Sequence, residues 1–377
     1  MTARPGGRKL RVGVLFGGQS SEHAVSIASA RSVIDALAPD TYEVVPIGIT
    51  RSGQWLTGGD PMRTLLEAGV QLTATPPPLE ISNNAPITSA LIASSGGALM
   101  PGPEGIAGDL HGLDVIFPVL HGPRGEDGTV QGFLELMDIA YVGSGVLASA
   151  TGMDKWAMKA VLRDAGLPTP RTELVRAHEW QRQPDVIRAR IARTLGFPCF
   201  VKPANMGSSV GVAKAHDDAE LIAALHGAFT YDRRVVVEEA IVGREVECSV
   251  LGNDEPQTSA VGEIVISGHD FYDYEAKYTD PTTRLDIPAN LPPHISAEVR
   301  RLAAETFRAL DAAGLARVDC FYDEAADRVL VNEINTMPGF TATSMYARMW
   351  AAVGVSYSEL VDRLVTLAME RHAHKSR

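Results

Sequence analysis

The chain has 377 residues, which exceeds the size that one hydrophobic core usually supports, so two or three packed domains are expected. Its 45% hydrophobic and 21% charged residues are typical of a globular protein and exclude a disordered or fibrous chain. A formal net charge of −12 excludes a general attraction to nucleic acid or to anionic membranes and favours a small-molecule partner.

The first part of the chain predicts an open, mostly parallel sheet. Residues 10–16 form an apolar, β-branched strand that ends in a glycine turn, and a helical pattern follows over residues 24–37. Further strands are predicted over residues 43–49 and 113–120. Residues 58–111, which are rich in Pro, Gly, Ser and Ala, are interpreted as a surface insertion with one short hairpin. The first domain is therefore expected to be α/β.

A second region begins with a helix predicted over residues 154–165, which Gly166 and Pro168 end. The stretch near residues 172–195 is interpreted as loops or variable helices. Beyond it, strands are predicted over residues 198–202, 211–214, 235–239, 245–251, 316–322 and 329–334, and helices near residues 296–313 and 356–370.

Cysteine spacing and hydropathy indicate a reducing compartment. The three cysteines, Cys199, Cys248 and Cys320, follow no CxxC spacing and lie in apolar runs, which is typical of buried free thiols. The apolar run behind the basic N-terminal residues covers only residues 12–16, so a first strand is favoured over a secretory signal. No run of about 18 apolar residues is present. We therefore expect a cytoplasmic protein.

A glycine-serine loop, residues 207–211, joins two predicted strands. Its glycines allow backbone N–H groups to approach phosphate oxygens, although no GK[ST] follows and a plain hairpin turn also explains the loop. Lys202 ends the preceding strand, and Lys155 lies on the helix that opens this region. Two converging ammonium groups would neutralise a polyphosphate, whereas either lysine alone is typical of a solvated surface charge.

Three oxygen-bearing side chains near strand ends suggest a metal site. Glu333 and Asn335 are two residues apart and share one face of a strand, and an antiparallel neighbour could add Asp319. Such hard oxygen ligands suit Mg²⁺, which takes its remaining ligands from water and phosphates. The alternative is a set of exposed strand carboxylates, but these acids interrupt apolar runs where an unpaired charge would be costly.

Three further segments carry candidate functional side chains. His121 opens the segment HGPRGEDG directly after a predicted strand, where parallel sheets bind ligands. The segment FYDYEAKY over residues 271–278 has the composition of a lid, although a disordered polar loop is the alternative. Glu22 follows the first strand, where helix capping is the alternative to a binding role.

Six motifs appear in a fixed order along the chain. They are GGQSSEHAVS from Gly17, HGPRGEDG from His121, VKPANMGSSVG from Val201, FYDYEAKY from Phe271, RVDCF from Arg317 and NEINTMPGFT from Asn332. Together they resemble the D-alanine–D-alanine ligase family of the ATP-grasp superfamily, from about residue 11 to the C-terminal helix. The resemblance implies an α/β protein, α+β in its ATP-binding part, with a three-domain ATP-grasp architecture. The domains are an N-terminal open parallel-sheet domain (1–148), a central ATP-grasp subdomain (149–240) and a C-terminal ATP-grasp domain (241–377) with a lid near 267–283.

The resemblance also implies a nucleotide site between the central and C-terminal domains. Lys155 and Lys202 would bind phosphates under the serine loop. The full set of implied ATP-binding residues is Lys155, Lys202, Ser208, Ser209, Glu238, Ala240, Ile241, Glu245, Lys277 and Asn332. Asp319, Glu333 and Asn335 would bind two Mg²⁺ ions, for which Mn²⁺ could substitute.

The reaction implied by the resemblance joins two D-alanine molecules through an acylphosphate, releasing ADP and phosphate, for cell-wall precursor synthesis. The implied catalytic residues are Glu22, Ser208, Tyr278, Arg317 and Gly339, and the implied substrate-binding residues are His121, Lys277, Ser344 and Met345. A homodimer formed through the N-terminal domain is also implied.

Three other functions were weighed against this one. A related ligase that makes D-alanyl-D-lactate or D-alanyl-D-serine would share every ATP and metal residue, although Tyr278 favours an amine acceptor by the same resemblance. A nucleotide-binding regulator without catalysis is disfavoured because Arg317, Glu333 and Asn335 are all present. A Rossmann oxidoreductase is rejected because Gly17-Gly18 lacks the GxGxxG spacing.

Overall fold

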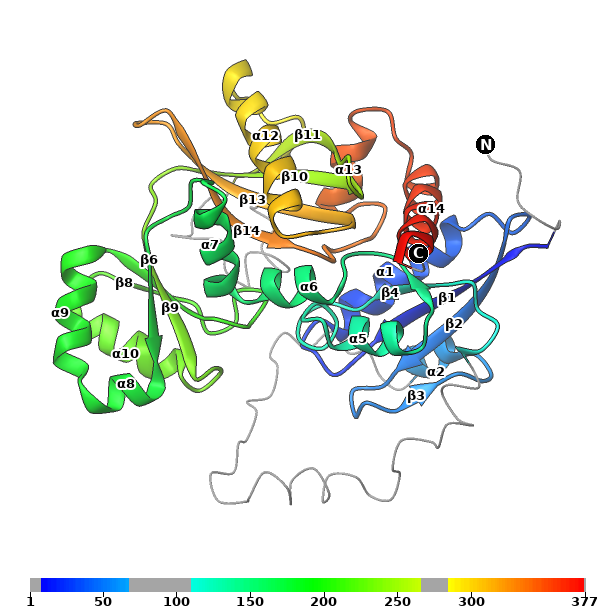
Figure 1. Cartoon of the computed structure of the whole chain (residues 1–377), viewed down its shortest axis with the longest axis horizontal. Coiled ribbons are helices and arrows are strands. Elements are labelled where there is room, and N and C mark those ends of the chain that lie inside the picture. The colour runs from blue at the N-terminus through cyan, green and yellow to red at the C-terminus, as the bar shows by residue number, and fades with distance from the viewer. Residues whose placement is uncertain (1–7, 68–109, 266–283, 376–377) are drawn as a thin grey trace.

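Three β-sheets organise the chain in the computed structural model, which describes residues 8–67, 110–265 and 284–375 (Figure 1). The N-terminal and C-terminal sheets lie close to each other, while the central sheet forms a separate lobe at the left of the view. The open parallel sheet expected at the N-terminus is confirmed, and the two further sheets are antiparallel.

The N-terminal sheet has the strand order β3-β2-β1-β4-β5 and is parallel except at β3. Its strands are β1 (Leu10–Gly17), β2 (Tyr42–Ile49), β3 (Trp55–Leu56), β4 (Val115–Val119) and β5 (Ala140–Tyr141). Its helices are α1 (His23–Ala36), α2 (Pro61–Glu67), α5 (Thr129–Leu136) and α6 (Val146–Met153). The continuous apolar run of β1 is buried on both faces, as a central parallel strand requires.

The central sheet has the antiparallel order β6-β9-β7-β8. Its strands are β6 (Thr172–Arg176), β7 (Cys199–Pro203), β8 (Ala213–Ala215) and β9 (Arg234–Glu239). Helix α7 (Lys155–Asp164) leads into it, followed by α8 (Ala177–Arg182), α9 (Pro184–Thr194) and α10 (Asp218–Ala228). Apolar residues of α9 and α10, among them Ile191 and Leu225, form a core with the central sheet. Among the described residues, all members of this core lie between Val175 and Val237.

The C-terminal sheet has the antiparallel order β12-β11-β10-β13-β14. Its strands are β10 (Arg244–Gly252), β11 (Gln257–Val265), β12 (Arg284–Asp286), β13 (Gly314–Asp323) and β14 (Arg328–Asn335), and its helices are α12 (Pro293–Ala309), α13 (Met345–Ala351) and α14 (Tyr357–Lys375). Helix α12 packs on the face that carries Val246, Cys248 and Val318. Because strand side chains alternate, Arg317 and Asp319 point to the opposite face.

Most predicted elements agree with the structure, and the differences have local causes. Strand β6 was missed because the stretch near 172–195 shows no clear alternation, and its partner β9 lies far along the chain. Strand β11 was also missed, and α14 extends to Lys375 rather than to residue 370. Of the predicted insertion 58–111, the described part holds α2, and residues 68–109 lie outside the described residues.

The three cysteines are buried and free, as expected. Within the described ranges, none of the helices combines the length and apolarity that a membrane span requires.

An aromatic cluster ties the end of the chain to the N-terminal sheet. Phe340 is fully buried, and its ring centroid lies 5.6 Å from that of Phe117 on β4, 5.6 Å from Tyr346 and 5.5 Å from Tyr357. Apolar residues of α14, such as Leu360 and Leu364, belong to the same core as β1 and β4. Helix α14 therefore belongs to the hydrophobic core of the N-terminal sheet.

This cluster predicts a large effect of truncation at Phe340. Phe340→Ala is expected to destabilise the protein by about 3–5 kcal/mol, because removal of this buried aromatic ring leaves a cavity between β4, α13 and α14. The control Val353→Ala, at a side chain that is 48% exposed, should stay within about 0.5 kcal/mol. Chemical denaturation followed by circular dichroism measures both, and a loss below about 1 kcal/mol for Phe340→Ala would contradict the role of the cluster.

Candidate active site

A cavity of about 710 Å³ opens where the three sheets meet, and it gathers nearly all the predicted site residues. The predicted residues that line it are Glu22, His121, Lys155, Lys202, Ser208, Ser209, Glu238, Ile241, Glu245, Arg317, Asp319, Asn332, Glu333, Asn335, Gly339, Ser344 and Met345. Ala240 is not part of the lining, although Glu239 and Ile241 on either side of it are. Lys277 and Tyr278 lie outside the described residues.

The glycine-serine loop is the hairpin between β7 and β8, and it has an unusual backbone. Ser208 and Ser209 have φ angles of 51° and 57°, in the left-handed region that side-chain-bearing residues seldom adopt. Gly211 also has a positive φ, and a Cβ there would lie 2.7 Å from Tyr231. A turn that keeps two strained serines points to a function for its backbone N–H groups, which can form a concave anion site.

Lys155 stands at the first turn of α7 and faces the cavity. Asp154 caps the helix by accepting hydrogen bonds from the N–H groups of Trp156 and Ala157. Lys155 Nζ donates to the carbonyl of Met206 at 2.6 Å, just before the serine loop. Its side chain is only 13% exposed and lies 4.0 Å from Glu333. Lys155 is therefore not a solvated surface charge.

Lys202 belongs to a buried group of three charges. Its Nζ donates to Glu238 Oε2 at 2.8 Å, and the other carboxylate oxygen lies 3.2 Å from Nζ of Lys159. Burial alone would raise the pKa of Glu238, but the charges of Lys159 and Lys202 hold it at about 2. The carboxylate is thus permanently ionised and shared by two ammonium groups.

The C-terminal sheet presents a second charged group on the other side of the cavity. Antiparallel pairing sets Asp319 opposite Glu333, as the sequence predicted, and Asn335 Nδ2 donates to Asp319 at 3.0 Å. Arg317 donates two hydrogen bonds of 2.7 Å to Asp319 and lies 3.1 Å from Glu247. Burial would lower the pKa of Arg317, but the two carboxylates raise it well above its ordinary value.

The residues predicted to bind magnesium offer oxygen ligands that Mg²⁺ prefers, but they are too few to complete its coordination. The described part of the chain has no group of three or more His, Cys, Asp and Glu side chains arranged for a metal ion. Two carboxylates and an amide oxygen nevertheless match the way Mg²⁺ is held by one or two carboxylates together with substrate phosphates. Asp319, Glu333 and Asn335 therefore fit Mg²⁺ in the presence of a nucleotide, and they do not make a complete cage by themselves.

The end of the cavity next to the N-terminal sheet holds Glu22, His121 and Glu126. Glu22 occupies the N-cap position of α1, but its side chain makes no capping hydrogen bond, so the structure does not support the capping alternative. His121 is buried, and its Nδ1 donates to the carbonyl of Met337 at 2.9 Å. Glu126 accepts hydrogen bonds from the N–H groups of Gly122 at 2.7 Å and Met337 at 3.0 Å.

Gly339 and Ser344 lie on the loop between β14 and α13. A Cβ at Gly339 would meet no atom within 4 Å, so the backbone there borders open space. Ser344 precedes α13 without capping it, and its hydroxyl donates to the carbonyl of Thr341 at 2.7 Å. Met345 is buried beside Ile264 and Met349. This loop closes the cavity between the N-terminal and C-terminal sheets.

Sequence reasoning missed three charged residues of this region: Lys159, Glu126 and Glu247. All three lie near motifs that the sequence did reveal. Lys159 follows Lys155 by four residues, which places both on one helix face. Glu126 lies inside the HGPRGEDG segment, and Glu247 shares a strand face with Glu245. Their spacing from residues already recognised in the sequence could therefore have identified all three.

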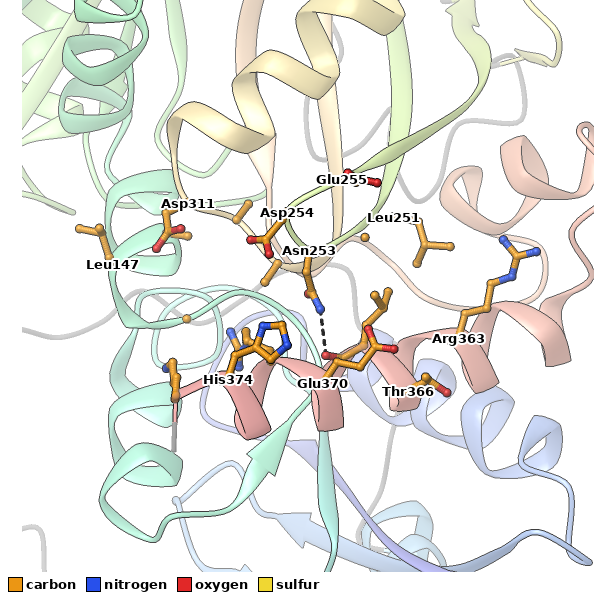
Figure 2. A pocket seen from close by; sticks show the side chains of 18 of the residues that line it. Leu147, Leu251, Asn253, Asp254, Glu255, Asp311, Arg363, Thr366, Glu370 and His374 are labelled. Atoms are coloured by element: carbon orange, nitrogen blue, oxygen red, sulfur yellow. Dashed lines mark hydrogen bonds between the residues drawn. The ribbon is translucent and has the colours of Figure 1, made fainter. Parts of the chain in front are cut away.

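A second cavity, of about 1020 Å³, is larger but contains none of the predicted site residues. It lies between the start of α6, the turn after β10 and helix α14, and Figure 2 shows Asn253 of the turn bonded to α14, where it donates to the carbonyl of Leu367. Its basic side chains are engaged locally: Lys375 pairs with Glu135, and Arg371 stacks 4.2 Å from the ring of Tyr141. The chemistry therefore belongs to the smaller cavity.

Comparisons with known proteins agree over nearly the whole chain. Residues 11–144 match the family model described as D-ala D-ala ligase N-terminus, and residues 161–366 match that described as D-ala D-ala ligase C-terminus. A D-alanine–D-alanine ligase of Geobacillus thermodenitrificans is 48% identical over 97% of each chain.

Two solved structures are also similar. The D-alanine–D-alanine ligase from Coxiella burnetii has a TM-score of 0.78 and 33% identity, covering 98% of this chain and 96% of that one. The VanG D-Ala:D-Ser ligase from Enterococcus faecalis has a TM-score of 0.77 and 34% identity, covering 96% of this chain and 100% of that one.

The environment of Glu126 predicts a pH dependence of stability. Burial and the charge of Glu22 raise the pKa of Glu126 from its ordinary value of 4.5 to about 8. The protonated form is therefore favoured in the folded state, and its contribution is complete below about pH 4.5 and is lost as the pH rises to about 8. Across this window, Glu126 lowers the free energy of unfolding by up to about 1.4 kcal/mol per pH unit.

Glu126→Gln is expected to remove this slope, because its side chain stays uncharged at every pH. Denaturation midpoints at pH 5.5, 6.5 and 7.5 measure the slope independently of any constant loss from the changed hydrogen bonds. Glu255→Gln, at an exposed turn, is the matched control and should keep the wild-type slope. Equal slopes in wild type and Glu126→Gln would contradict the shifted pKa.

Proposed function

The chain belongs to the D-alanine–D-alanine ligase family, and on that premise we propose how its site residues share the work of the reaction. The enzyme joins two D-alanine molecules in an ATP-dependent reaction that serves peptidoglycan synthesis. The single observation that carries the assignment of roles is the convergence on one cavity of Lys155 from α7, Lys202 from the central sheet and the Asp319–Glu333 pair from the C-terminal sheet.

The chemistry requires activation of a carboxylate, because a carboxylate has no good leaving group. Phosphoryl transfer from ATP to the first D-alanine gives an acylphosphate, and the free amine of the second D-alanine then displaces phosphate. Neither step needs a covalent bond to the protein. Positioning and the neutralisation of charge in a closed site are therefore the main contributions of the chain.

In this proposal, ATP lies between the central and C-terminal sheets. Lys155 and Lys202 bind its phosphates, and the N–H groups around Ser208 and Ser209 cover them. Glu238, Ala240 and Ile241 hold the adenine, and Glu245 binds the ribose hydroxyls. Asn332 lies close to the phosphates. The low pKa of Glu238 and the burial of both lysines support a preformed, positively charged floor.

We propose Asp319, Glu333 and Asn335 as the residues that hold two Mg²⁺ ions, or Mn²⁺ in their place. When bound there, the metal neutralises negative charge on the phosphate oxygens. Arg317 now engages Asp319 through both carboxylate oxygens, and Glu247 is its second carboxylate partner. Arg317 can therefore keep one ion pair while Asp319 serves a metal ion.

The first D-alanine is assigned to the end of the cavity near α1. Glu22 binds its ammonium group, with His121 beside it, and Arg317 and the Gly339 N–H stabilise the oxyanion that forms at its carbonyl. Ser344 and Met345 flank the second D-alanine, whose carboxylate is bound by Ser344 together with Lys277. Ser208 links Glu22 to Tyr278, and the lid (267–283) that carries Lys277 and Tyr278 lies outside the described residues.

Three domains, residues 1–148, 149–240 and 241–377, remain our proposed division of the chain. The three sheets fall within these ranges, although α14 packs on the first sheet. We further propose a cytoplasmic homodimer that uses the N-terminal domain.

The acceptor is the part of the function that an assay can test most directly. With ATP and Mg²⁺, the purified protein is expected to form D-alanyl-D-alanine from D-alanine alone, with one ADP released for each dipeptide. L-Alanine, D-serine and a mixture of D-alanine and D-lactate serve as comparisons, with products identified by mass. ADP release that depends on D-serine or D-lactate would instead favour the acceptor type of the VanG relative or a D-lactate ligase.

Glu333→Gln tests the assignment of the C-terminal acids. Turnover is expected to fall by about 100-fold or more, because the change removes one charge at the proposed metal site and leaves core packing intact. The control Glu305→Gln, on the exposed side of α12, should retain activity within about twofold. Steady-state rates at saturating Mg²⁺, with circular dichroism to verify folding, measure both, and unchanged turnover would remove Glu333 from the site.

A further inference from the structure

Lys159 is a buried lysine that none of the roles above uses. It lies on α7 one helical turn after Lys155, and its side chain is 1% exposed. It is absent from the described lining of the cavity, so it lies behind the wall that a nucleotide would touch. A lysine is almost never fully buried unless its charge is paired, so a specific role is indicated.

The ammonium group of Lys159 contacts two different sheets. Its Nζ donates to the carbonyl of Asn332 on β14 at 3.0 Å and lies 3.2 Å from Glu238 Oε1 on β9. The carbonyl fixes the position of the ammonium group. The ion pair places it on the side of the Glu238 carboxylate that faces away from Lys202.

The charges in this group do not cancel. Two ammonium groups share one carboxylate, so the three side chains carry a net charge of +1. Only Lys202 of the two lysines lines the cavity, with 13% of its side chain exposed. Burial lowers the pKa of Lys159, against the attraction of Glu238. The excess positive charge is available to the cavity only while Lys159 neutralises Glu238 from behind.

We propose that Lys159 is a positioning residue for the nucleotide phosphates: by pairing with Glu238 from behind the cavity wall, it leaves the charge of Lys202 free to bind them. This inference rests on the proposed function, in which Lys202 binds phosphate. Without Lys159, Lys202 becomes the sole counter-ion of a buried carboxylate. Moving Lys202 toward a phosphate would then expose an unpaired buried charge, which is costly.

A positioning role and a purely structural role of Lys159 predict different effects on the binding of ligands that differ in charge. A packing defect would weaken binding of the whole nucleotide to the same degree. Loss of positive charge on Lys202 weakens binding of phosphates and spares the nucleoside. The ratio of the dissociation constant for adenosine to that for ATP, called here the phosphate preference, separates the two cases.

The first experiment compares wild type with Lys159→Met by calorimetric titration with ATP, ADP and adenosine at fixed Mg²⁺, without D-alanine. Lys159→Met is expected to lower the phosphate preference by about tenfold or more, while adenosine affinity changes by less than about threefold. Lys214→Met is the matched control for loss of one positive charge. Lys214 lies on the β7–β8 hairpin that also carries Lys202, but it does not line the cavity, so this variant should keep the wild-type phosphate preference.

A double-mutant cycle with Glu238→Gln keeps the test valid if Lys159→Met alone folds poorly. Without the Glu238 carboxylate, no second ammonium group is needed to leave the charge of Lys202 free for phosphate. Adding Lys159→Met to Glu238→Gln should therefore change the phosphate preference by less than about threefold. Any general loss of nucleoside binding caused by Glu238→Gln cancels in this comparison.

The outcomes are distinguishable. A normal phosphate preference in Lys159→Met, or a tenfold loss on adding it to Glu238→Gln, would overturn the role of Lys159 and leave the proposed ATP site intact. Failure of wild type to bind ATP would overturn the ATP-site assignment itself. Reduced preference in Lys159→Met together with an unchanged preference in the Glu238→Gln background would establish the proposal.

Discussion

The register of β10, β13 and β14 is the constraint on which the site depends. It sets Asp319 between Glu247 on one neighbouring strand and Glu333 on the other, with Arg317 two residues away on the same face. A slip of one residue would turn these charges toward the apolar face under α12. Because unpaired charges there would be costly, the pairing that stabilises the sheet also specifies the position of its charged groups.

The sequence predicted the parts of the site that are local. Asp319 and Glu333 were recognised because an unpaired carboxylate in an apolar strand would be costly. The serine loop was recognised by its glycines. Lys159 could not be found in this way, since a lysine in a helix pattern looks the same whether it is exposed or buried. Its partners on β9 and β14 are 79 and 173 residues distant along the chain, and only tertiary structure brings them together. Strand β6 was missed for a similar reason, because its pattern depends on pairing with β9.

The three parts of the molecule are joined by two different kinds of contact. The N-terminal and C-terminal sheets share one hydrophobic core and two hydrogen bonds at Met337: its carbonyl accepts from His121, and its N–H donates to Glu126. The central sheet has its own core. Helix α7 connects it to the C-terminal sheet, where Lys155 and Lys159 contact β14 through polar groups and Met158 and Leu162 join the apolar core. Displacement of the central sheet would therefore leave its own core intact, whereas separation of the other two sheets would open a core that they share.

The position of α14 also bears on how the protein is made. Strands β1 and β4 are synthesised well before α14, yet one face of their sheet is covered by Leu360, Leu364 and their neighbours on that helix. The N-terminal sheet can form its strands early but cannot complete its core until α14 has been synthesised. A nascent chain of this protein consequently carries an uncovered apolar face until α14 leaves the ribosome, and docking of that helix is the event that shields it.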